Sequence, residues 1–347
     1  MIDWHTVTVG YNADYLEPDR VMCISPAGEI KWHNDQRIPV LGSYDDRIMI
    51  GRGSASKSML DDRQRKGFAC SDTSNLWISG NPVKFISGHN VFGPPVSQRF
   101  DLLDNLIKHH LGAYTPDIDE QTPATYETRV DIATMVNFGS HNDVHDWIYT
   151  AQRATRSRSG RPATNYDTTV YWGQRSTLWS LKAYCKHCEL LKHPPNHPDK
   201  DGIIADVKGM LRLELVLRSK ELRKLEQRQI ELDESLIWQY AQERIRGIEL
   251  KTELLENNPS ELKDLGLSTG AIACLINWRS GNDPKTIYPH KTFYRHRKDI
   301  LNIVGVDISN EYNPEIAEKK IRGIKWLMAH EVKYPGPWIA GSSSPVS

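Results

Sequence analysis

Residues 177–190 read TLWSLKAYCKHCEL, and the part from 177 to 186 has the composition of a β-strand. Side chains alternate between the two faces of a strand, so we expect Lys182, Tyr184 and Lys186 on one face and apolar residues on the other. Two neighbouring ammonium groups would favour the phenolate of Tyr184 and would steady a phosphate that it attacks. The same pattern also fits a tyrosine on an exposed sheet face, so spacing alone leaves both interpretations open.

The stretch also contains a CxxC motif. Together with His193 and His197, Cys185 and Cys188 form the pattern C-x2-C-x4-H-x3-H, whose ligand types and compact spacing resemble a zinc knuckle. Against zinc, Cys185 falls on the apolar face of the expected strand. A thioredoxin-like redox motif is favoured still less, because no β-α-β pattern surrounds this CxxC.

Outward from this stretch, the chain predicts a strand-rich sheet followed by a helical tail. Residues 168–172 and 177–186 predict a hairpin that turns at GQRS. We expect an α+β fold, an antiparallel sheet with helices packed on it, with one domain in residues 1–225 and a smaller, mainly α-helical domain in 226–347. The other expected elements are strands at 47–51, 75–80, 128–138 and 209–219 and helices at 100–111, 140–154, 268–281, 290–305 and 313–330.

Composition bounds the function classes. Lys and Arg together number 44 and so do Asp and Glu, so a nonspecific cationic coat for DNA is excluded and any nucleic-acid contact must come from local patches. One candidate patch is the loop 153–161, which could equally be a solvated loop. The other is a helix–turn–helix-like spacing in 268–298, which could equally be a plain helical scaffold. The basic residues of these patches are Arg153, Arg156, Arg158, Arg161, Arg295, Arg297 and Lys298.

Other features exclude further classes. The five cysteines are odd in number and scattered, which argues against a disulfide framework. The polar, acidic N-terminus and the lack of a long apolar run predict a cytoplasmic protein without membrane contact. Residues 51–58, GRGSASKS, imitate a phosphate-binding loop, but Ser56 stands where the second glycine belongs, so we expect no nucleotide cofactor.

Several segments, in order, resemble the replication initiator of filamentous phages, the gene II/X family of rolling-circle nicking-and-joining proteins. The GHNVFG sequence and the AYxKHxEL block are the specific ones. The resemblance covers roughly residues 1–220 and implies the sheet-based nicking domain of rolling-circle initiators. The segments are MID at the N-terminus, NPVKFISGHNVFG (81–93), TRVDIATMV (128–136), YDTTVYW (166–172), LKAYCKHCEL (181–190) and GMLRLELVLRS (209–219).

The resemblance implies roles for particular residues. Tyr184 would be the nucleophile, with Lys186 stabilising the phosphate and His187 acting as a base or a metal ligand. Asp131 and Glu214, in the R-x-D and R-x-E motifs, would hold a divalent metal, Mg²⁺ or Mn²⁺. The His-hydrophobic-His pair typical of related endonucleases is missing. The candidate to complete the metal or substrate site is therefore His89, which could equally do no more than order a turn bounded by glycines. The remaining expected DNA contacts are Lys182 and Arg129.

The implied function is a site-specific endonuclease that nicks and rejoins one strand of a phage origin through a 5′-phosphotyrosine. Its implied partners are supercoiled origin DNA, the displaced single strand, and a host helicase and DNA polymerase in the host cytoplasm, with a homo-oligomer on DNA as a further possibility. Two alternatives stay open: a noncatalytic nucleic-acid-binding protein with a zinc knuckle, and a plasmid relaxase with the same chemistry.

Overall fold

A computed structural model describes most of the chain. Some of the predicted features lie outside the described residues. They are Arg161, the side chain of Arg153, residues 54–58 of the stretch that imitates a phosphate-binding loop, and the start of the expected helix 313–330. The described ranges are 1–13, 16–42, 46–53, 75–111, 125–158, 163–246, 259–304, 308–309, 312 and 322–333.

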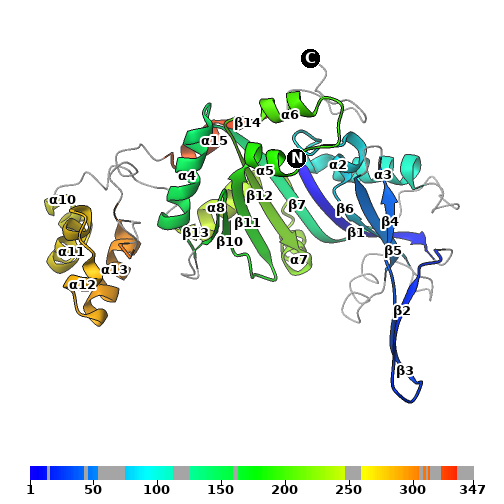
Figure 1. Cartoon of the computed structure of the whole chain (residues 1–347), viewed down its shortest axis with the longest axis horizontal. Coiled ribbons are helices and arrows are strands. Elements are labelled where there is room, and N and C mark those ends of the chain that lie inside the picture. The colour runs from blue at the N-terminus through cyan, green and yellow to red at the C-terminus, as the bar shows by residue number, and fades with distance from the viewer. Residues whose placement is uncertain are drawn as a thin grey trace.

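A 10-stranded sheet forms the centre of the molecule, in the order β4-β5-β6-β1-β7-β12-β11-β10-β9, with β14 paired to β7 (Figure 1). All of its pairs are antiparallel, as expected. The strands are β1 (Ile2–Asn12), β4 (Ile38–Leu41), β5 (Arg47–Gly53), β6 (Asn75–Gly80), β7 (Thr125–Asn137), β9 (Thr164–Tyr166), β10 (Thr169–Trp172), β11 (Trp179–Cys185), β12 (Met210–Arg218) and β14 (Glu331–Val332).

The register of the sheet gives it one polar and one apolar face. Lys182 of β11 lies opposite Glu214 of β12, and Tyr184 lies opposite Arg212. Val216, two residues after Glu214, lies opposite Asp131 of β7. Directly opposed residues share a face, so these polar side chains all belong to one side of the sheet. The intervening residues of β11 and β12 are apolar and fully buried on the other side.

Helices cover the apolar face. Helix α4 (His141–Ala154) contacts β10, β11 and β12, and α8 (Ser235–Arg244) contacts β7, β11 and β12. Helix α4 begins at Ser140, whose side chain accepts a hydrogen bond from the Asp143 amide, the cap that the sequence predicted. Helices α2 (Pro82–Ser87) and α3 (Arg99–His110) pack together beside β1. The helices α4 and α8 therefore leave uncovered the polar face, which carries Lys182, Tyr184 and Glu214.

The strand β11 ends one residue earlier than expected. It stops at Cys185, and Lys186 is the first residue of α5 (Lys186–Lys192). The Cys185 sulfur accepts a hydrogen bond from the Cys188 amide and caps this helix. The expectation that Lys186 continues the alternation beside Tyr184 is therefore wrong. After α5 come α6 (Lys200–Asp206) and then β12.

The C-terminal part of the described chain forms a helical cluster with its own hydrophobic core. Its helices are α10 (Pro259–Asp264), α11 (Thr269–Arg279), α12 (Pro284–Ile287) and α13 (His290–Ile303). The main core itself extends past residue 225, because α8 and α15 (Ile324–Ala329) contribute buried residues to it. Between β12 and α8 lies α7 (Ser219–Gln227).

Two short pairs lie outside the main sheet. Strands β2 (Arg20–Ile24) and β3 (Ile30–Asp35) form a ribbon that projects away from it (Figure 1), and β8 (Arg156–Ser157) pairs with β13 (Ile245–Arg246). No helix among the described residues is long and apolar enough to span a lipid bilayer.

Candidate active site

Tyr184 lies on the polar face with 7% of its surface exposed, and its hydroxyl donates a hydrogen bond to Glu214 Oε1. Burial and the negative charge of Glu214 raise the pKa of this phenol well above its usual value. The expectation that neighbouring lysines favour a phenolate is therefore wrong for the unbound protein. Tyr184 is held as a neutral phenol whose proton points at a carboxylate.

Glu214 is an anion with three partners. Its Oε1 also accepts a hydrogen bond from Arg212 Nε at 2.9 Å, and its Oε2 pairs with the ammonium of Lys182. Burial alone would raise the pKa of Glu214, but the positive charges of Lys182 and Arg212 lower it to about 2. The carboxylate can therefore orient the phenol of Tyr184 at neutral pH.

Arg212 ties three segments together. Its guanidinium is fully buried, donates to Asp3 Oδ1 at 2.9 Å, and donates to the backbone oxygen of Asn90 at 2.7 Å. Asp3 lies on β1 and Asn90 in the GHNVFG sequence, so β12 is connected to both. The strand pattern predicts no role for Asp3 or Asn90, although both lie in segments that carry the family resemblance.

Asn90 connects this network to Lys186. Its Nδ2 donates to Asp3 Oδ1 at 2.7 Å, and its Oδ1 accepts from Lys186 Nζ at 2.8 Å. The buried ammonium of Lys186 also pairs with Glu189 at 2.7 Å. Burial lowers the pKa of Lys186, and the charge of Arg212 lowers it further. Lys186 thus belongs to the site through Asn90, rather than through the strand position beside Tyr184.

Asp131 is buried on β7, close to the same network, and pairs with the partly exposed Arg129. Arg129 donates to both of its carboxylate oxygens, at 2.8 and 2.6 Å. Burial raises the pKa of Asp131, Arg129 lowers it, and the negative charges of Asp3 and Glu214 raise it again, to about 6. The neighbouring strands β1, β7 and β12 therefore bring three carboxylates together, each of them paired with an arginine or a lysine.

Two predicted histidines have other histidines as ring neighbours. The ring of His89 is buried and edge-on to His197, with 5.7 Å between ring centroids, and its Nδ1 accepts a hydrogen bond from the Val91 amide. His187 lies on α5 with its ring 5.1 Å from that of His141 on α4. These contacts connect both rings to segments outside the Tyr184–Glu214 pair.

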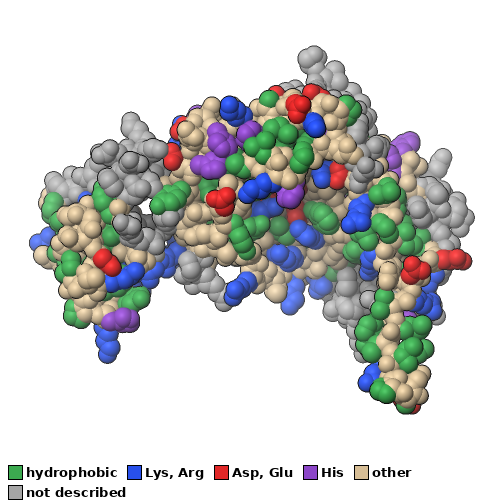
Figure 2. All heavy atoms as spheres, in the orientation of Figure 1, with side chains coloured by type: hydrophobic (Ala, Val, Ile, Leu, Met, Phe, Trp, Pro, Cys, Tyr) green, Lys and Arg blue, Asp and Glu red, His purple; other side chains and the backbone are tan. Residues whose placement is uncertain are grey.

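Basic and aromatic side chains surround the network on the polar face. Figure 2 shows Lys and Arg side chains across the middle of the molecule, where Figure 1 places β10 to β12. Lys182 and Arg129 are 27% and 42% exposed. Tyr171 of β10 lies opposite Lys182, and its ring meets the exposed ring of Tyr166 edge-on. These side chains form a polar, partly aromatic surface beside Tyr184.

The other predicted DNA-binding residues are spread over the chain. Arg156 is part of β8, which pairs with β13, and Arg158 directly follows this strand and is exposed. On α13, Arg295 and Lys298 are exposed, and the guanidinium of Arg297 lies 5.8 Å from the ring centre of Tyr294. The described arginines of the two predicted patches therefore belong to separate surfaces.

A second group of potential ligands lies behind the sheet. His141 and His145 of α4 meet Cys185 and Cys188, and their ligand atoms lie within 4.8 Å of one another. The predicted zinc knuckle paired these cysteines with His193 and His197 instead. His193 ends α5 and is exposed, whereas His197 contacts His89. The H-x3-H spacing at 141–145 was the sequence signal for the histidines that reach the cysteines.

Known proteins resemble the chain over most of its length. Residues 1–243 match the family of the N-terminal part of a phage replication-associated protein, and residues 272–340 match the family of its C-terminal part. The replication-associated protein of Enterobacteria phage I2-2 is 28% identical over 330 residues, 89% of this chain and 88% of that protein. Its namesake in Salmonella phage IKe is 26% identical over 116 residues, 33% of this chain and 27% of that protein. The first family match includes every strand of the Tyr184 network.

Proposed function

Because the chain belongs to the family of replication-associated proteins that initiate replication in filamentous phages, we propose that it nicks and rejoins one strand of a phage origin. These reactions would start and finish rolling-circle replication. The observation that carries the proposal is the hydrogen bond from the buried phenol of Tyr184 to Glu214, close to two further carboxylates. A nucleophile, a proton acceptor and anionic groups that suit a metal thus meet on one sheet face.

In the proposed reaction the Tyr184 oxygen attacks the phosphorus of the scissile phosphodiester. The new O–P bond forms as the P–O3′ bond breaks, the phenol proton passes to Glu214, and the departing 3′ oxygen takes up a proton from water. The products are a 5′-phosphotyrosine and a 3′-OH that a polymerase can extend. Later attack by a 3′-OH on the phosphotyrosine reverses these bond changes and closes the displaced strand.

The proton transfer depends on bonding to phosphorus. The free phenol is a much weaker acid than the carboxylic acid form of Glu214, because the pKa of Tyr184 is raised and that of Glu214 is lowered to about 2. The phenol becomes acidic only as its oxygen bonds to phosphorus, so Glu214 accepts the proton late in the step. Until then the hydrogen bond to Glu214 only orients the Tyr184 oxygen. Because the phenol stays protonated, it is a weak nucleophile in the absence of DNA.

The residues fit a divalent metal such as Mg²⁺ or Mn²⁺ in part. Asp3 and Asp131 offer hard oxygen ligands on neighbouring strands, and the pKa of Asp131 is raised chiefly by burial and further by the negative charges of Asp3 and Glu214. The carboxylates of Asp131 and Glu214 both have partners at each oxygen, and Glu214 is assigned the role of proton acceptor because it already accepts the hydrogen bond of the Tyr184 phenol. A metal held here would polarise the scissile phosphate and stabilise developing charge.

The polar face offers a path for DNA. Lys182 and Arg129 have partly exposed cationic groups that can contact phosphates on either side of Tyr184. The rings of Tyr166 and Tyr171 can stack on bases of a single strand. Affinity that comes from these charges must fall with rising salt, although the chain as a whole is neutral.

The remaining partners are proposed from the family's role. Supercoiled origin duplex is the first substrate and the displaced strand the second, with a host helicase and DNA polymerase acting at the nick in the host cytoplasm. The α10–α13 cluster, with Arg295 and Lys298 exposed on α13, would bind origin DNA or a second copy of the chain.

Nicking of a supercoiled plasmid that carries DNA from around the protein's own gene tests the proposal. The wild type should nick it with Mg²⁺ present, and Tyr184→Phe should bind the same DNA without nicking it. The matched control is Tyr171→Phe, which removes a neighbouring phenol on the same face and should keep nicking. Equal nicking by Tyr184→Phe and the wild type would refute the role of Tyr184.

A further inference from the structure

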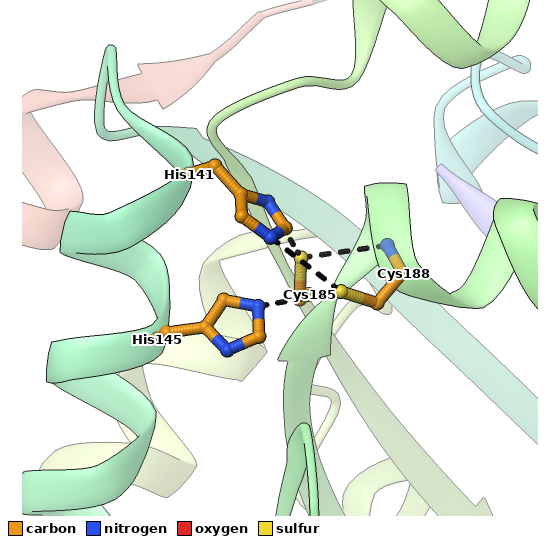
Figure 3. Close-up of side chains that lie close together, drawn as sticks. All are labelled: His141, His145, Cys185 and Cys188. Carbon is orange, nitrogen blue, oxygen red and sulfur yellow. Dashed lines mark hydrogen bonds between the residues drawn. The ribbon is translucent and has the colours of Figure 1, made fainter.

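The strongest unassigned group of side chains lies between α4 and the junction of β11 with α5. Figure 3 shows His141 and His145 pointing from α4 towards Cys185, the last residue of β11, and Cys188, in the first turn of α5. One ligand atom from each residue lies within 4.8 Å of the other three. Histidine side chains also gather at the surface over α4 and α5 in Figure 2.

The chain builds this cluster from two local patterns. His141 and His145 are four residues apart, so they lie on one face of α4, one turn from each other. The period of two in β11 sends Tyr184 to the polar face and Cys185 to the apolar face that α4 covers. The turn into α5 then returns Cys188 to the same place, with its amide 3.5 Å from the Cys185 sulfur.

The spacing of the ligand atoms is close to that of a tetrahedral metal site. His145 Nε2 lies 3.3 Å from the Cys188 sulfur, and His141 lies 3.6 Å from the Cys185 sulfur through Nδ1 and 3.8 Å from the Cys188 sulfur through Nε2. Tetrahedral zinc with bonds of about 2.0–2.3 Å has ligand–ligand edges of roughly 3.3–3.8 Å. A single ion takes only one nitrogen of His141, so the His145 distance and one of the two His141 distances apply together, and both of these fall in this range. The four ligand atoms lie within 4.8 Å of one another, so the cluster has to close modestly around an ion.

The donor set selects the metal. Two thiols and two imidazoles, with no carboxylate among the four, suit Zn²⁺ and disfavour Mg²⁺ or Mn²⁺, which prefer oxygen ligands. Four protein ligands also complete a tetrahedron, so no position is left open for water or substrate. Such a site is structural, and it is distinct in chemistry from the carboxylates around Tyr184.

We propose that His141, His145, Cys185 and Cys188 bind one Zn²⁺, which fixes α4 to the β11–α5 junction. Binding deprotonates both thiols, so two protons leave as two Zn–S bonds and two Zn–N bonds form. Cys185 lies between Tyr184 and Lys186 in the chain. The ion therefore positions the backbone that carries both of these side chains, and this effect on nicking rests on the proposed function.

Metal analysis of the purified full-length protein tests the site. The protein is dialysed against Zn²⁺, freed of loose ion and measured by mass spectrometry. The wild type should hold about one zinc per chain, and Cys188→Ser and His145→Gln should hold little. The matched controls are Cys23→Ser and His193→Gln, which change the same residue types outside the cluster and should keep the ion. Zinc that stays in both cluster variants, or is absent from the wild type, overturns the proposal.

A second measurement on the wild type avoids variants that fail to fold. Replacement of the bound ion by Co²⁺ should give the sulfur-to-cobalt charge-transfer band and the intense visible bands of a tetrahedral sulfur–nitrogen site. A spectrum without these bands, or a Cys185–Cys188 disulfide found by peptide mapping of protein purified under reducing conditions, would contradict zinc binding.

Nicking assays separate this proposal from the proposed function. Tyr184→Phe should retain the full zinc content while it loses nicking. Removal of zinc from the wild type by a chelator, followed by supply of Mg²⁺ alone, should slow nicking, and added Zn²⁺ should restore it. Zinc binding without any nicking by the wild type would refute the function and leave the zinc site intact.

Discussion

Replacement of Asp131 by asparagine should stabilise the protein while it abolishes nicking. Asp131 is 3% exposed, and its pKa is raised from 3.8 to about 6, chiefly by burial, against the opposing effect of Arg129. A raised carboxyl pKa means that folding favours the protonated form. The stability that this protonation contributes is therefore complete below pH 3.8 and is lost as the pH rises through 6. Asparagine imitates the protonated form at every pH.

The size of the effect follows from the two pKa values. With a pKa of 3.8 in the unfolded chain and about 6 in the folded protein, linkage gives ionised Asp131 a cost in stability of about 2 kcal/mol at pH 5 and about 3 kcal/mol at pH 8. Asp131→Asn should therefore exceed the wild type in free energy of unfolding by an amount that grows by about 1 kcal/mol over this interval. Burial leaves little solvent screening to reduce it.

Urea unfolding followed by tryptophan fluorescence at pH 5, 6, 7 and 8 measures the difference. The control is Asp206→Asn, the same substitution at an exposed position of α6 outside the site. A difference for Asp131→Asn that is independent of pH, or that shrinks as the pH rises, would refute the idea that folding favours the protonated form of Asp131. Nicking by the variant at the wild-type rate would contradict its place in the site.

Three further outcomes are expected. Arg212→Met should lower the free energy of unfolding, measured by urea titration, by about 3–5 kcal/mol, because Asp3 and Glu214 lose a buried cation. A loss below about 1 kcal/mol would contradict this. Asn90→Ala should slow single-turnover nicking by about tenfold or more at unchanged DNA affinity, because it removes the link to Lys186; an unchanged rate would speak against that link. Lys182→Gln should reduce by about one the slope of log affinity against log salt, measured by filter binding; an equal slope would exclude a phosphate contact.

The sequence predicts much of the sheet because strand alternation is a local property. The period of two in β11 correctly separates Tyr184 from Cys185, and the antiparallel α+β fold and the family are confirmed. The alternation fails at Lys186 because KHCELLK forms a helix that Cys185 caps. An error of one residue in the predicted end of a strand therefore changes which neighbours are predicted for a side chain such as Lys186.

The network around Tyr184 could not be predicted in the same way, because its partners are distant in the chain. Arg212 is buried only because Asp3, 209 residues away, and Asn90, 122 residues away, accept its hydrogen bonds. A strand pattern gives no sign of such contacts. The ionisation of Tyr184 likewise depends on burial and on Glu214 rather than on the lysines that are its neighbours in sequence.

Only part of the histidine and cysteine cluster could be predicted from the sequence. The CxxC motif was visible, but the nearest histidines that follow it in a knuckle-like spacing, His193 and His197, are not the ones that reach it. His141 and His145 carry the i, i+4 spacing of a helix-borne pair, yet only the packing of α4 on β11 joins them to the cysteines.

The most direct test of the central claim is to map the covalent DNA adduct. A single-stranded oligonucleotide that spans the origin nick site is incubated with the wild type and Mg²⁺, and the trapped product is digested and sequenced by mass spectrometry. The account predicts a 5′-phosphate linked to Tyr184 and to no other tyrosine. An adduct on a different residue, or cleavage that leaves a 5′-phosphate free of protein throughout the reaction, would contradict it.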